Sequence, residues 1–110
     1  MLPSCAQKNV VVTLGLRKGD GVLFSAHFDS VSTAPGATDD GMSVVALLQL
    51  VKFLSMNRPR RTAVFNINNG EEDGLHGAHT YVVSFTPHFN SHRKIQVFAA
   101  SMVRSDINFY

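Results

Sequence analysis

The sequence predicts an α/β domain, and three observations carry that prediction. Residues 22–28 form a near-continuous apolar run, which suits a strand covered on both faces, and residues 62–68 form a further predicted strand. Between them, residues 42–56 repeat apolar side chains at three- and four-residue steps, which is the period of an α-helix. The order strand, helix, strand predicts a crossover unit with two parallel strands. We therefore expect a partial three-layer sandwich around a mixed β-sheet.

The residues before this unit predict one further strand and a turn. Residues 9–16 are rich in β-branched side chains, which favour an extended backbone. They are followed by RKGDG at 17–21, where Asp20-Gly21 is typical of a hairpin turn. We expect this turn to lead into the strand at 22–28.

The predicted helix over 42–56 has two acids just before it. Asp39 and Asp40 stand where carboxylates can cap a helix and complement the positive end of its dipole. The helix itself is apolar nearly all round, so we expect it to be well buried.

The rest of the chain is less regular. Residues 69–79 have the composition of a loop, in which His76 and His79 are expected to be loop or helix-start residues. Residues 81–85 and 95–103 fit either a strand or a helix, with Pro87 between them. His88 and His92 would share a face if that part were helical.

Composition limits the classes of protein that fit. The chain has 110 residues, 45% of them hydrophobic and 16% charged, which suits one small packed domain. A net charge of +2 is too small to predict a nucleic-acid surface. A single cysteine, Cys5, excludes an intrachain disulfide. No apolar run is long enough for a membrane segment.

Acidic residues and a histidine gather where the predicted strands end. His27 and Asp29 follow the strand at 22–28, Asp39 precedes the helix, and Glu71 and Glu72 follow the strand at 62–68. The carboxyl ends of parallel strands lie at one edge of a sheet, where such folds place their sites. Carboxylates grouped there would repel each other unless a cation joined them, and histidine with carboxylates suits zinc. Two alternatives to a metal site stay open: Asp39 and Asp40 could only cap the helix, and Glu71 and Glu72 could only belong to a solvated loop.

Two segments carry distinctive motifs, HFDSVSTAPGATDDGMSVV at 27–45 and NINNGEEDGLHGAH at 66–79. They resemble the M28 family of zinc peptidases, and within it a fungal branch at the vacuolar membrane. The resemblance covers residues 9–79. It implies that the parent is a zinc-dependent exopeptidase of the aminopeptidase type, which hydrolyses peptide bonds with a water activated by two Zn²⁺ ions.

The resemblance also implies residue roles. His27 would be a ligand of one zinc, Asp39 would bridge the two zincs and Glu72 would be a ligand of the second. Glu71 would be the general base, and Asp29 the catalytic acid behind His27.

Three further expectations rest on the resemblance. The family often has a cis peptide at the position of Asp39–Asp40. It also places a further acidic ligand downstream, whereas residues 95–101 contain no acid. We therefore expect residues 1–110 to be a single partial catalytic domain, with residues 80–110 as a divergent tail. The parent would be anchored at the vacuolar membrane, with its catalytic domain in the lumen.

Because zinc ligands that the resemblance implies are missing, we expect the 110-residue chain to be an incomplete and inactive fragment of such a peptidase. Two alternatives stay open from the sequence. One is a non-catalytic α/β module. A single-zinc acyltransferase like the glutaminyl cyclases is the other alternative, since those enzymes share the fold family.

Overall fold

A mixed β-sheet forms the centre of the computed structural model, which describes residues 8–15, 20–85 and 95–99. The strands within these residues are β1 (Val10–Leu14), β2 (Gly21–His27), β3 (Thr62–Asn68) and β4 (Ile95–Ala99), in the spatial order β1-β3-β2-β4. β2 is parallel to both β3 and β4, while β1 is antiparallel to β3. The predicted mixed sheet and the parallel pair are thereby confirmed.

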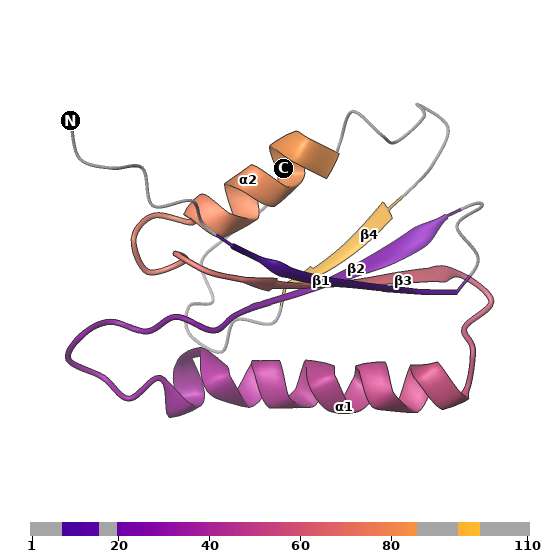
Figure 1. The fold of residues 1–110 in the computed structure, drawn as a ribbon, viewed down its shortest axis with the longest axis horizontal. Coiled ribbons are helices and arrows are strands. Elements are labelled where there is room, and N and C mark those ends of the chain that lie inside the picture. Colours follow the sequence, from indigo (N-terminus) through magenta and orange to yellow (C-terminus); the bar gives the residue numbers. More distant parts are fainter. Residues whose placement is uncertain (1–7, 16–19, 86–94, 100–110) are drawn as a thin grey trace.

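Helices cover both faces of the sheet (Figure 1). Helix α1 (Met42–Met56) lies along one face and helix α2 (His76–Phe85) crosses the other. The three layers match the predicted sandwich. None of the helices in the described ranges has both the length and the apolar character needed to cross a membrane.

The core lies between the sheet and α1. Its buried members are Ala26, Leu47, Ala63 and Phe65, with Phe24 packed against them. The rings of Phe24 and Phe65 stack with their centroids 5.0 Å apart. Leu47 comes from α1. The other four side chains come from alternate positions of β2 and β3, so they share the face that α1 covers.

The hairpin prediction is wrong. Asp20-Gly21 does not join two paired strands, because β3 lies between β1 and β2. β1 pairs with β3 instead, with Val10 opposite Ile67. This antiparallel pairing brings the start of β1 to the end of β3.

Two other expectations need correction. The helix over 42–56 is not buried all round, because only one of its faces meets the sheet, and Val45, Phe53 and Met56 are exposed. The loop predicted over 69–79 ends earlier, since α2 begins at His76.

The two segments that fitted either a strand or a helix differ in structure. Residues 81–85 belong to α2, with Tyr81 buried, and residues 95–99 form β4. His76 and His79 lie in the first turns of α2, as expected, and both are exposed. Cys5, Pro87, His88, His92 and residues 100–103 lie outside the described residues.

Core packing predicts a large difference between two phenylalanines. Phe65→Ala should lower the free energy of unfolding by about 3–5 kcal/mol, because Phe65 is fully buried and its removal leaves a cavity. Phe53→Ala is the control. Phe53 is 57% exposed, so its loss should cost well under about 1 kcal/mol. Urea denaturation followed by circular dichroism measures both, and equal losses would contradict this account of the core.

Candidate metal site

The candidate site lies at the carboxyl ends of β2 and β3. His27 is the last residue of β2, and its neighbour across the parallel pair is Asn68, the last residue of β3. The two strand ends are joined by a hydrogen bond of 3.0 Å from the Phe28 N–H to the Asn68 carbonyl. The loops that follow the two strands therefore start side by side.

His27 is the centre of the site and is 4% exposed. Its Nδ1 lies 3.0 Å from the backbone carbonyl of Asp29, which can only accept a hydrogen bond, so Nδ1 carries a proton. Nε2 is then the nitrogen left to bind a proton or a metal. It lies 3.1 Å from Asp39 Oδ1 and 3.8 Å from Glu71 Oε2.

A metal ion would fit this arrangement. One ligand atom each from His27, Asp39 and Glu72 lies within 4.8 Å of the other two. Nε2 and Asp39 Oδ1 are both acceptors when the imidazole is neutral, so their close approach calls for a proton or a cation shared by the two. Imidazole nitrogen with carboxylate oxygen is a donor set that zinc accepts.

Without a metal, the surrounding acids act on His27. Burial by itself would lower the pKa of the imidazole. The Asp29 carbonyl and the carboxylates of Glu71, Asp40 and Asp39 outweigh burial and raise the pKa of His27 above its ordinary value. The site thus favours positive charge on His27.

Asp29 connects the two loops. Its Oδ1 accepts the backbone N–H of Glu71 at 3.2 Å, and its Oδ2 accepts that of Glu72 at 3.1 Å. Burial would raise the pKa of the Asp29 carboxyl, but these two N–H groups outweigh it and lower that pKa. Asp29 is therefore held as a carboxylate, in contact with the backbone of the very residues whose side chains face His27.

Glu71 differs from Asp29 in its surroundings. Burial is the main cause that raises the pKa of the Glu71 carboxyl. The nearby His27 opposes this, while the charges of Glu72, Asp39 and Asp29 add to it. A carboxylate with a raised pKa is a better proton acceptor than an ordinary glutamate.

Asp39 and Asp40 do not cap α1, contrary to the alternative weighed from the sequence. No side-chain hydrogen bond caps the helix, which begins after Gly41. Asp39 faces His27, while Asp40 is 1% exposed and its Oδ2 accepts the backbone N–H of His27 at 3.2 Å. The expected cis peptide between Asp39 and Asp40 is present.

Sequence reasoning missed several polar residues that support the site. Asn66 donates to Asn68 Oδ1 at 2.6 Å, and Asn68 donates to Ser25 Oγ at 2.7 Å. Both asparagines are buried on the face of β3 opposite α1. Their alternation with Phe65 and Ile67 could have predicted this arrangement. Amides at every second position of an apolar strand indicate that one buried face of the strand is polar.

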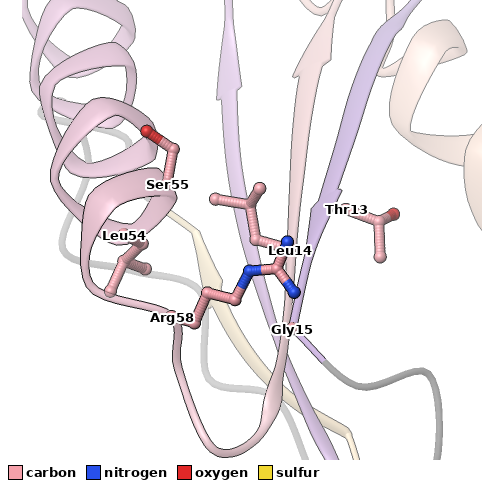
Figure 2. A pocket seen from close by; sticks show the side chains of 6 residues that line it. All are labelled: Thr13, Leu14, Gly15, Leu54, Ser55 and Arg58. Carbon is pink, nitrogen blue, oxygen red and sulfur yellow. The ribbon is translucent and has the colours of Figure 1, made fainter.

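A separate cavity lies at the other end of the sheet. It lies between the end of β1 and the end of α1 (Figure 2). Its volume is about 340 Å³. Its lining residues are Thr13, Leu14, Gly15, Leu54, Ser55 and Arg58. None of these is a histidine, cysteine or acid, so the cavity is not part of the metal site.

The fold and the site together define an α/β domain with a candidate metal centre at the ends of parallel strands. The chain belongs to peptidase family M28, whose sequence pattern matches residues 9–105. That match takes in residues beyond 79, and the expected boundary between a family-like part and a divergent tail stays a prediction. No solved structure matches the chain.

The chain is also similar to proteins named vacuolar membrane protease. It is 73% identical to the one from Laccaria bicolor over 63 residues, which are 57% of this chain and 6% of the relative. It is 63% identical to that of Schizophyllum commune over 76 residues, 67% of this chain and 8% of the relative. For Saccharomyces cerevisiae the identity is 61% over 62 residues, 56% of this chain and 6% of the relative. The chain thus spans a small part of these relatives.

The lowered pKa of Asp29 predicts how stability depends on pH. A group whose pKa is lower in the folded state stabilises that state above its ordinary value of 3.8, and the effect is lost as the pH falls through the folded pKa. With chelator present at pH 7, Asp29→Asn should therefore reduce the free energy of unfolding by about 1–3 kcal/mol. The difference from wild type should shrink below about pH 4.

Urea titrations at several pH values measure this difference. Asp73→Asn is the matched control, because Asp73 is exposed in the same loop, and it should have little effect at any pH. A loss for Asp29→Asn that stays constant down to pH 2 would contradict the account.

Proposed function

We propose that this chain is part of the catalytic domain of a zinc-dependent exopeptidase of the aminopeptidase type. The observation that carries the proposal is the grouping of His27, Asp39 and Glu72 with Glu71 beside them. Membership of peptidase family M28 supports hydrolysis of peptide bonds. The substrate is accordingly a peptide, cleaved at its N-terminal residue.

His27, Asp39 and Glu72 would hold zinc, with Asp39 shared between two ions in the intact domain. When bound, zinc supplies a Lewis acid that polarises the substrate carbonyl and makes water more acidic. The Nδ1–H bond to the Asp29 carbonyl fixes the ring of His27 so that Nε2 faces the other two ligands.

Glu71 is proposed as the general base. Its Oε2 lies 3.8 Å from His27 Nε2, so its carboxylate stands next to the ligand group. Burial raises its pKa and thus its affinity for the proton of an attacking water. The same carboxyl, once protonated, can pass the proton to the leaving amine.

Asp29 has a different part in this proposal. It does not reach the ligand atoms directly but holds His27 by its carbonyl and the Glu71–Glu72 backbone by its carboxylate. Its contribution to catalysis is therefore to position both the metal ligands and the base.

The name of the relatives supports a location for the parent protein. We propose that the longer protein to which this domain belongs acts at the vacuolar membrane, as the name vacuolar membrane protease says of the relatives.

The general-base role predicts the effect of one isosteric change. In the full-length protein, Glu71→Gln should reduce kcat for hydrolysis of an N-terminal residue by about 10²–10⁴-fold, because the amide cannot accept the proton. The zinc content should stay unchanged, since Glu71 is not one of the three ligands. Asp73→Gln is a control for the loop. Near wild-type turnover in Glu71→Gln would rule out this base.

The ligand role predicts selective loss of zinc. The 110-residue chain should bind about one Zn²⁺ through its three ligands, and His27→Ala should abolish this binding. His76→Ala is the matched control, because His76 is exposed and lies outside the ligand group. Mass spectrometry of metals after dialysis gives the count. Equal zinc in both variants would show that the ions bind elsewhere.

A further inference from the structure

The side chain of Asn9 joins two points of the chain that flank Glu71 and Glu72. Its Oδ1 accepts the backbone N–H of Asn69 at 3.1 Å, and its Nδ2 donates to the carbonyl of Gly77 at 2.6 Å. Asn9 stands immediately before β1, and the antiparallel pairing of β1 with β3 carries it to this place. One amide thus contacts both ends of the loop that supplies the acids.

The loop between these two points is a compact unit. Leu75 N–H donates to the Glu71 carbonyl at 2.9 Å, and His76 N–H donates to the Gly70 carbonyl at 3.0 Å. Internal bonds of this kind fix the shape of the loop, but they do not fix its position relative to β2. That position depends on contacts with other elements, namely Asp29 on one side and Asn9 on the other.

The close packing at Gly77 shows how tightly this second contact is built. A Cβ at Gly77 would lie 2.1 Å from the Asn69 carbonyl oxygen and 2.6 Å from Asn9 Oδ1. Both distances are far below ordinary contact, so only glycine allows the first turn of α2 to approach Asn69 and Asn9. The start of the loop, its end and Asn9 therefore meet at a single point.

We propose that Asn9 is a positioning residue for the site. By holding Asn69 and Gly77 it sets where Glu71 and Glu72 stand relative to His27 and Asp39. Asparagine suits this task because its amide donates and accepts at once, whereas aspartate can only accept and alanine can do neither. The consequence for zinc rests on the proposed function, but the consequence for the loop does not.

Amide hydrogen exchange in the metal-free 110-residue chain tests the effect on the loop. The N–H groups of Glu71 and Glu72 bond to Asp29 and do not touch Asn9. Asn9→Ala should nevertheless speed their exchange by about tenfold, the factor that corresponds to losing one or two hydrogen bonds. Exchange in the β2–β3 ladder, at Phe24 and Phe65 for instance, should change less than about twofold.

Two further variants sharpen the test. Asn57→Ala removes a comparable bond from an asparagine side chain to a backbone carbonyl, at the end of α1, and should leave Glu71 and Glu72 at wild-type rates. Asn9→Asp keeps the acceptor for Asn69 and loses the donor to Gly77, so it should give intermediate rates. Asn9→Asp also carries the test if Asn9→Ala does not fold.

Zinc titration of the same variants gives the second readout. With Zn²⁺ alone as the probe, Asn9→Ala should weaken binding by about 10–100-fold, as is usual when residues that orient metal ligands are lost. Asn57→Ala should bind as wild type does. Exchange at Glu71 and Glu72 that stays at the wild-type rate in Asn9→Ala, or rises equally through β2 and β3, would overturn the proposal. If Asn9→Ala speeds exchange in the loop alone while the wild-type chain binds no Zn²⁺, the positioning role of Asn9 is supported and the metal site is refuted.

Discussion

The site depends on the bond between one carboxylate and two successive backbone amides. Asp29 follows β2, and its two oxygens take the N–H groups of Glu71 and Glu72, which follow β3. A charged acceptor makes such bonds stronger than those between neutral groups. Because the Asp29 carbonyl also orients the ring of His27, a single residue relates the histidine of one loop to the acids of the other. The candidate ligand atoms could not converge if these two loops moved independently.

The sheet order makes this bond possible. β2 and β3 are parallel neighbours, so the loops that follow them start at the same edge. β1 runs the other way along β3, and its beginning therefore reaches that edge as well. This explains why Asn9, 60 positions before Asn69 in the chain, lies against the loop that carries the acids. One antiparallel edge strand adds a third element to a site that two parallel strands begin.

The sequence predicts the elements better than it predicts their neighbours. The composition of β2 and β3 and the helical period of α1 are strong local signals. The crossover unit that they predict places the acids at the strand ends close together, at one edge of the sheet. The pairing of β1 with β3 could not be predicted from the Asp20-Gly21 signal. Such a signal concerns only the local chain, whereas β3, which lies between β1 and β2, comes from a distant part of the sequence. Residues 81–85 and 95–99 were ambiguous because short apolar runs lack a clear period. For Asp39 the helix-cap alternative is wrong, because its carboxylate lies 3.1 Å from His27 Nε2. The grouping of acids and a histidine at the strand ends indicated this contact, whereas the local cap pattern did not.

The balance of charge in the site supports a bound cation. Asp29 is satisfied by backbone N–H groups, and one oxygen of Asp40 accepts the His27 N–H. Within the described part of the chain, the other oxygen of Asp40 is buried without a hydrogen-bond partner. Asp39 and Glu71 both lie close to the imidazole of His27, which can carry one positive charge. One imidazolium cannot offset several carboxylates at such short distances, whereas divalent ions can. The negative charge around it raises the pKa of His27 in spite of burial, whereas burial is the main cause that raises the pKa of Glu71 and the neighbouring carboxylates add to it.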